Sequence, residues 1–215
     1  MNLQSTLLSY ILPLPAILFS LSFHEASHAW MANKLGDPTS KNLGRISLDP
    51  TKHLDPIGFL CFVVFGFGWA KPVLVNSRNF KNARRDDLLT SLAGPISNII
   101  LAIISAIIFG IYLKIVGINY ISTKYIIVTQ LLSTFVTVNV VLAVFNLLPI
   151  PPLDGYHVFK NILLKSIPYK FFIFVERNSM YILILMVFLL NTTNVLSGVM
   201  NWAINLVLNI SRMFL

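Results

Sequence analysis

The chain is poor in charge and in cysteine. Of its 215 residues, only 11% are charged, whereas 56% are hydrophobic. Soluble domains carry about twice this proportion of charged residues, so the composition favours a membrane-embedded protein. Cys61 is the only cysteine, which excludes an intrachain disulfide and a metal site built on several thiolates. No break in composition marks a second domain, and we therefore expect residues 1–215 to form a single membrane-embedded domain.

Among the charged residues, acidic side chains are fewer than basic ones. Eight Asp and Glu stand against 16 Lys and Arg, which gives a formal net charge of +8. The basic residues form no run with interleaved aromatics, so we expect no nucleic-acid partner. Membrane proteins gather Lys and Arg in their cytoplasmic loops, and this accounts for the same excess.

The first 23 residues contain neither lysine nor arginine. A secretory signal peptide begins with a basic region, so we interpret this apolar stretch as a retained membrane helix. About 20 apolar residues suffice to cross a bilayer. Runs of comparable length occur at 7–32, 88–116, 125–148 and 178–196. A last run, 199–215, either spans the bilayer or lies in its interface.

A shorter apolar run, 58–70, is interrupted by Gly66 and Gly68. It is too short to span a bilayer, and its Phe and Val content favours strands. The predicted fold is an all-α polytopic membrane protein. It has roughly four to five membrane helices and a re-entrant or β-hairpin segment between the first and second spans.

The loop charges predict an orientation. Two loops are rich in basic residues, the one after the first span and the one after the third. The first loop contains Lys34, Lys41, Arg45, Lys52, Lys71, Arg78, Lys81, Arg84 and Arg85. The second contains Lys160, Lys165 and Lys170. The positive-inside rule places both in the cytoplasm and the N-terminus outside the cell membrane. His28 and Asp154 then lie toward the cytoplasmic side.

The first apolar run ends in His24-Glu25-Ala26-Ser27-His28. Histidines four residues apart lie on one helix face, where both imidazoles reach one metal ion. The glutamate between them can act as general base on a metal-bound water. Ionisable groups at membrane depth are costly and usually functional. The motif therefore predicts metal binding by His24 and His28, with Glu25 as the catalytic base.

A catalytic zinc needs a third protein ligand. Asp154 follows the third span in a proline-rich stretch, and irregular backbone at membrane depth requires surrounding protein or a water-filled cavity. From the residues alone, a zinc ligand and a solvated Pro-x-Asp-Gly turn are equally good interpretations of Asp154. His157 and His53 are alternatives. We expect His53, in a charged loop, to be solvated. We expect His157 to orient the metal ligands without binding the metal itself.

Two motifs together, His24–His28 and Asn146–Gly155, resemble the zinc motifs of the site-2 protease family of intramembrane metalloproteases. Residues 44–50, 68–73 and 93–98 also resemble family motifs. The resemblance implies one zinc ion per chain with Asp154 as its third ligand. It also implies that Asn146 stabilises the oxyanion, although an amide at a helix end also suits an interhelical hydrogen bond.

Further consequences follow from the same resemblance. The segment 68–73 would lie beside the site and pair with an extended substrate. No stretch is long or polar enough for a PDZ or CBS module, as expected of a short form of the family.

The expected function is zinc-dependent intramembrane proteolysis of single-pass membrane proteins, with zinc-bound water as nucleophile. The alternative is a membrane metal transporter or metal sensor that uses the same ligands, for which Glu25 would be dispensable. Transporters often contain internal repeats, and none is visible here. The sequence predicts no particular substrate and no oligomeric state.

Overall fold

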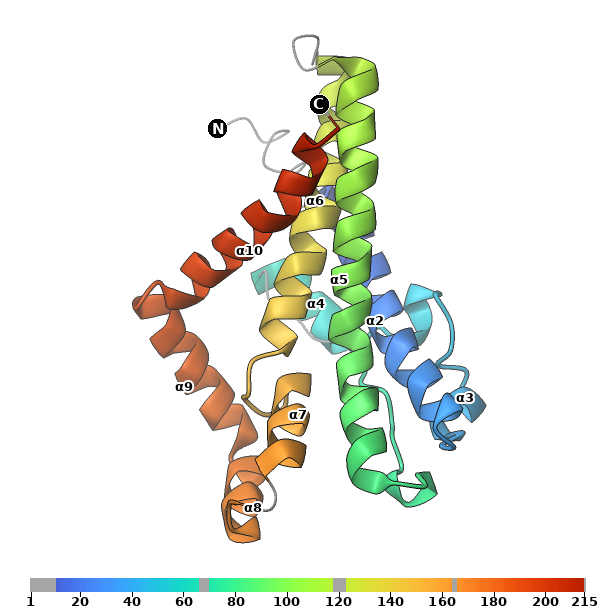
Figure 1. Ribbon diagram of the computed structural model, residues 1–215, viewed down its shortest axis with the longest axis vertical. Coiled ribbons are helices and arrows are strands. Elements are labelled where there is room, and N and C mark those ends of the chain that lie inside the picture. The colour runs from blue at the N-terminus through green and yellow to red at the C-terminus, as the bar shows by residue number, and fades with distance from the viewer. Residues whose placement is uncertain (1–10, 66–69, 118–122, 164–165, 215) are drawn as a thin grey trace. The chain divides into compact units, whose positions relative to one another are not determined.

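The computed structural model describes residues 11–65, 70–117, 123–163 and 166–214. Within these ranges the regular secondary structure is helical, and no β-strand is present (Figure 1). A single isolated antiparallel bridge joins Leu54 to Ala70. The all-α prediction is therefore confirmed for the described part of the chain.

The chain divides into two compact units. The first comprises residues 1–20, 98–145 and 188–215, and the second comprises residues 21–97 and 146–187. Helices α2 (Leu14–Lys34) and α5 (Ala83–Val116) each contribute residues to both units. Every contact described below lies within one unit.

Two of the expected membrane spans are present as long apolar helices. They are α5 and the Tyr125–Asn146 part of α6 (Thr123–Asn146). A third span would be formed by α8 (Tyr169–Arg177) together with α9 (Ser179–Thr192), which meet at a bend of 78°. The described residues thus support two to three spans in a membrane protein. Four to five spans remain a prediction, and part of the expected 7–32 span lies outside the described residues.

The expectation of strands in the 58–70 run is wrong over its first half, because Pro56–Phe65 forms helix α4. The Asp55 carboxylate accepts a hydrogen bond from the Gly58 N–H at 2.8 Å, and Pro56 occupies the first helical position. An Asp cap followed by proline is a strong helix start, and here it overrides the strand propensity of Phe and Val. Residues 66–69 lie outside the described residues, so a re-entrant segment stays a prediction.

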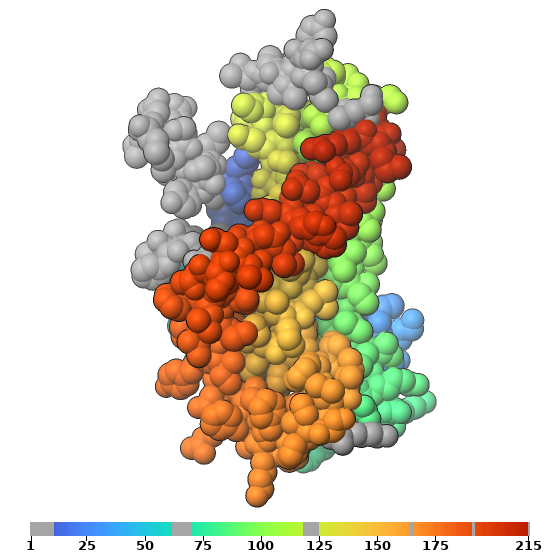
Figure 2. All heavy atoms as spheres, turned by 60° about the vertical axis from the view of Figure 1, so that its left-hand side comes forward, coloured from blue at the N-terminus to red at the C-terminus, as the bar shows by residue number. Residues whose placement is uncertain are grey.

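In the first unit, α10 (Val195–Arg212) packs across α5 and α6 (Figure 2). The buried cluster at this contact consists mainly of small and β-branched side chains, Ala102, Ala106, Val136 and Val140. Small residues allow membrane helices to approach closely. The α10 side chains packed against this cluster are apolar, including Ala203, Ile204 and Val207. The three asparagines of α10, Asn201, Asn205 and Asn209, are exposed.

A polar network ties three helices of the first unit together. The Asn98 side chain on α5 donates to Asn139 Oδ1 on α6 at 2.9 Å, and Asn139 Nδ2 donates to Ser20 Oγ on α2 at 2.9 Å. All three side chains are fully buried. Hydrogen bonds of this kind hold helices together where lipid offers no competing partner. They fix the N-terminal part of the helix that carries the histidine motif.

The second unit contains the C-terminal half of α2, the start of α5, α7 (Asp154–Leu163) and α8. It also contains three short helices, α3 (Thr39–Asn42), η1 (Pro50–Lys52) and η2 (Ser77–Asn79). Tyr156, Phe172 and Val175 form the apolar core between α7 and α8. This unit holds every candidate site residue.

Candidate metal centre

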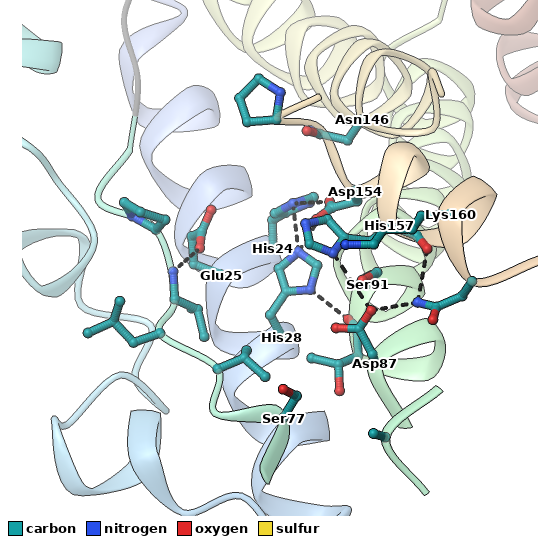
Figure 3. Close-up of a pocket in the computed structure, with 18 of the residues that line it drawn as sticks. His24, Glu25, His28, Ser77, Asp87, Ser91, Asn146, Asp154, His157 and Lys160 are labelled. Atoms are coloured by element: carbon teal, nitrogen blue, oxygen red, sulfur yellow. Dashed lines mark hydrogen bonds and ion pairs between the residues drawn. The ribbon is translucent and has the colours of Figure 1, made fainter. Parts of the chain in front are cut away.

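Three side chains meet in the second unit, as Figure 3 shows. His24 and His28 come from α2, and Asp154 comes from the first turn of α7. Asp154 Oδ2 lies 3.1 Å from His24 Nε2 and 3.2 Å from His28 Nε2, and the two Nε2 atoms are 3.0 Å apart. Both histidines are buried, with 3% and 7% of their surface exposed. The structure thus brings together the three residues that the sequence analysis selected as metal ligands.

The donor set fits a zinc ion. A tetrahedral zinc with ligands at about 2.0–2.1 Å places neighbouring ligand atoms roughly 3.3 Å apart, close to the spacing of these three atoms. Two imidazole nitrogens and one carboxylate oxygen form a ligand set that zinc accepts. Asp154 Oδ2 is buried, and the described residues give it no hydrogen-bond donor. A buried carboxylate oxygen without a donor requires another partner, and a metal cation provides one.

The orientation of one imidazole is fixed from behind. His28 Nδ1 lies 2.7 Å from the carbonyl oxygen of Thr90 on α5. A carbonyl only accepts, so Nδ1 carries the hydrogen and donates it. In the neutral imidazole Nε2 is then left unprotonated, which is the form that binds a metal.

Two glycines allow the ligands to approach each other. Gly155 packs against the carbonyl groups of Leu147 and Leu148, where a Cβ would collide with the backbone. Gly94 on α5 lies against both imidazoles, and a Cβ there would stand 2.6 Å from His24 Nε2 and closer still to His28 Nε2. A side chain at Gly94 would have to displace the two imidazoles, and one at Gly155 would have to displace the backbone of Leu147 and Leu148.

Substitution Gly94→Ala is therefore expected to remove zinc from the purified protein. The added methyl group would push the two imidazoles away from the position that the three ligands share. Gly198→Ala is the matched control, because a Cβ at Gly198 in α10 meets nothing within 4 Å. Metal analysis by mass spectrometry should show zinc retained in the control and lost in Gly94→Ala. Equal zinc content in the two variants would contradict this account of the centre.

The three candidate ligands line a cavity of about 810 Å³. Glu25 lines the same cavity, and its Oε2 accepts a hydrogen bond from the Val73 N–H at 3.2 Å. Residues 72–75 belong to no helix or strand and form part of the cavity wall. The base candidate, the ligand triangle and this stretch therefore face one shared space (Figure 3).

Asn146 is the last residue of α6 and also lines this cavity. It therefore shares this cavity with the candidate ligands, and its role at the oxyanion stays a prediction.

His157 and His53 both lie outside the ligand triangle. His157 lines the cavity, and its Nδ1 is 3.7 Å from Asp87 Oδ2 on α5. The expectation that His53 is solvated is wrong, because only 1% of its surface is exposed and its Nε2 lies 2.7 Å from the Ser47 carbonyl. The chain folds back on itself between Arg45 and Leu54, which buries the side chains of Arg45 and His53 while most of the loop between them stays exposed.

Sequence reasoning missed the groups that hold α7 against α5. Asp87 accepts a hydrogen bond from Asn161 Nδ2 at 2.5 Å. The Arg84 guanidinium donates to the carbonyl groups of Asn161 and Ile162 at the end of α7. A cation at a helix C-terminus is favourable, because the last carbonyls lack partners within the helix. These contacts fix the helix whose first residue is Asp154.

Comparison with known proteins places the chain in a family. Residues 13–190 match the model of peptidase family M50. "Putative zinc metalloprotease YwhC" of Bacillus subtilis is 42% identical over 146 residues, which cover 68% of this chain and 66% of the relative.

Two further relatives share the name "Putative zinc metalloprotease Rip2". The protein of Mycolicibacterium smegmatis is 28% identical over 154 residues, and that of Mycobacterium tuberculosis strain H37Rv is 32% identical over 155 residues. Each match covers 68% of this chain and 55% of the relative, so the chain spans less than two thirds of the length of these proteins. No solved structure matches the chain significantly. The family match extends over most of the sequence and includes all three candidate ligands, and the chain therefore belongs to peptidase family M50, the site-2 protease family of metalloproteases.

Proposed function

We propose that residues 1–215 form one membrane-embedded domain that performs zinc-dependent proteolysis of single-pass membrane proteins. The observation that carries this proposal is the triangle of His24, His28 and Asp154, with ligand atoms 3.0 to 3.2 Å apart, in one cavity with Glu25. The names of the relatives and the family support a peptidase that uses zinc. Ionisable groups placed beside apolar helices are costly unless they serve a function.

Each residue has a role that suits its position. His24, His28 and Asp154 hold one zinc ion, which when bound polarises the scissile carbonyl and activates the attacking water. The Glu25 carboxylate accepts a proton from that water and delivers it to the amide nitrogen that leaves when the C–N bond breaks. The Asn146 amide donates a hydrogen bond to the carbonyl oxygen as negative charge develops there.

An extended substrate suits the cavity wall. The stretch 72–75 is non-helical, and the Val73 N–H points to Glu25. A transmembrane helix must unwind before a peptide bond can be attacked, because the helix encloses its own backbone. Pairing of the unwound segment with this stretch would present its backbone to Glu25.

The proposal is tested by coexpressing the chain with a panel of tagged single-pass membrane proteins. Wild-type protein should convert at least one of them to a shorter product, and Glu25→Gln should leave the same protein intact. A product formed equally with both forms would show that another protease made it. Absence of a product across a broad panel, with zinc bound, would favour a metal transporter or sensor.

The orientation is a separate prediction. Loop charges place the N-terminus outside and residues 71–85 in the cytoplasm, so that the site opens toward the cytoplasmic side. Arg78 is exposed and can be replaced by cysteine in a Cys61→Ser background. A membrane-impermeant maleimide should label position 78 only after the cells are permeabilised. Ready labelling of intact cells would reverse the proposed topology.

A further inference from the structure

The non-helical stretch Lys71–Asn76 contacts the proposed base directly. Its third residue, Val73, donates its N–H to Glu25 Oε2 at 3.2 Å. The stretch itself belongs to no helix or strand. Its position therefore depends on contacts that other segments make with it.

A buried carboxylate holds the far end of the stretch. Asp37 Oδ2 accepts a hydrogen bond from the Asn76 N–H at 2.7 Å. Its other oxygen, Oδ1, accepts from the Thr39 N–H at 3.1 Å, the Thr39 hydroxyl at 2.5 Å and Asn79 Nδ2 at 2.7 Å. Asp37 is fully buried, and it forms no ion pair among those recorded for the described residues. Burial disfavours its charged form, but these four hydrogen bonds more than offset that cost and lower the pKa of Asp37.

Asp37 is also fixed to the helix that carries Glu25. Gly36 adopts a φ of +110°, which turns the chain at the end of α2. The Asp37 N–H then donates to the Ala32 carbonyl at 2.9 Å, in the last turns of α2. Only glycine takes such a φ readily. The carboxylate therefore moves with α2 and anchors Asn76 relative to that helix.

Three further contacts hold the stretch on either side of Val73. The Ser40 hydroxyl donates to the Leu74 carbonyl at 2.5 Å. At the near end, the Lys71 N–H donates to the His53 carbonyl at 2.7 Å, and the buried Arg45 guanidinium reaches the Lys71 carbonyl at 3.4 Å. The stretch is thus anchored at 71, 74 and 76, and Val73 lies between these anchors.

We propose that Asp37 is a positioning residue for Glu25. By binding the Asn76 N–H, it holds the stretch so that the Val73 N–H stays on the Glu25 carboxylate and orients it toward the cavity. This inference rests on the proposed function only in assigning Glu25 as the base. The contact chain from Asp37 through Asn76 to Val73 stands independently of it.

Substitution Asp37→Asn isolates this role. An asparagine can keep its oxygen at the Oδ1 position, where three donors converge, but its NH2 group then faces the Asn76 N–H. Two donors cannot hydrogen-bond each other, so the anchor at Asn76 is lost while the contacts of Thr39 and Asn79 remain. Thr39→Val is the matched control, because it removes a hydroxyl from Oδ1 and leaves the Asn76 bond intact.

Hydrogen exchange of the full chain, purified in lipid nanodiscs, measures the anchor directly. Loss of a hydrogen bond to a charged group should speed amide exchange at Asn76 and Val73 by about tenfold or more in Asp37→Asn. Exchange in α5 and the zinc content should match the wild type, and Thr39→Val should exchange like the wild type at both amides. For a validated substrate, kcat should fall by roughly tenfold to a hundredfold. Faster exchange at Asn76 with unchanged exchange at Val73 would overturn the proposal, as would an unchanged kcat.

A second variant covers the case in which Asp37→Asn does not fold. Ser40→Ala removes the bond to the Leu74 carbonyl without altering a buried charge. It should speed exchange at Val73 in the same direction and leave zinc in place, and unchanged exchange would refute the anchoring. If wild-type protein cleaves no substrate, the proposed function fails, and the exchange rates still decide whether Asp37 positions the stretch.

Discussion

Glutamine at position 25 is expected to leave zinc bound and to abolish turnover. Glu25→Gln preserves the size of the side chain, and its amide oxygen can still accept the hydrogen bond from Val73. It removes the carboxylate that takes the proton from the attacking water, and loss of a general base typically costs about a hundred- to ten-thousand-fold in rate. Metal analysis and kcat on a validated substrate should be measured on the same preparation.

Glu176→Gln provides the control for this substitution. Glu176 lies on α8 with Lys160 and Tyr156 as its partners and does not line the cavity. The same chemical change there should retain both zinc and turnover. Wild-type cleavage by Glu25→Gln would exclude a Glu25-dependent protease and would favour the transporter or sensor interpretation.

The features that the sequence predicted well are local ones. His24 and His28 share a helix face because they stand four residues apart, so their proximity follows from helix geometry alone. The apolar helices α5 and α6 follow from runs of suitable length and composition. Asp154 was different, because the sequence cannot show which loop meets which helix. Its place beside the histidines depends on close approaches at Gly94 and Gly155. The residues alone left a zinc ligand and a solvated turn as equally good interpretations of Asp154, and the family resemblance favoured the ligand.

The features that the sequence analysis misjudged depend on tertiary burial. His53 was expected to be solvated because it lies in a loop rich in charge. It is buried instead, as is Arg45 of the same loop, because the loop contacts the stretch that begins at Lys71. Asp37 carried no signal beyond its position after a helix-ending glycine. Its role is visible only in the folded structure, where Asn76 and Asn79, about 40 residues later, donate hydrogen bonds to its carboxylate. Local periodicity carries no information on such contacts.

Asparagine at position 154 is expected to cause loss of zinc, whereas Glu25→Gln is expected to keep zinc and lose turnover. Asp154→Asn keeps the shape of the side chain but replaces an anionic oxygen ligand by a neutral amide, which binds zinc more weakly. Buried Asp154 Oδ2 lies within 3.2 Å of both His24 Nε2 and His28 Nε2, so no other described carboxylate can take its place without rearrangement. About one zinc per chain is expected in the wild type, and the variant should lose most of it on dialysis against a chelator.

The cavity itself supplies the control for that loss. Asp87 is a second aspartate lining the same cavity, and its partners are Asn161 and His157 rather than the ligand triangle. Asp87→Asn should therefore retain zinc through the dialysis that strips Asp154→Asn. The double variant His24→Ala, His28→Ala sets the baseline for a chain without the site. Zinc retained by Asp154→Asn but lost by the double variant would remove Asp154 from the ligand set. Zinc retained by the double variant would place the metal elsewhere in the chain and refute the centre as a whole.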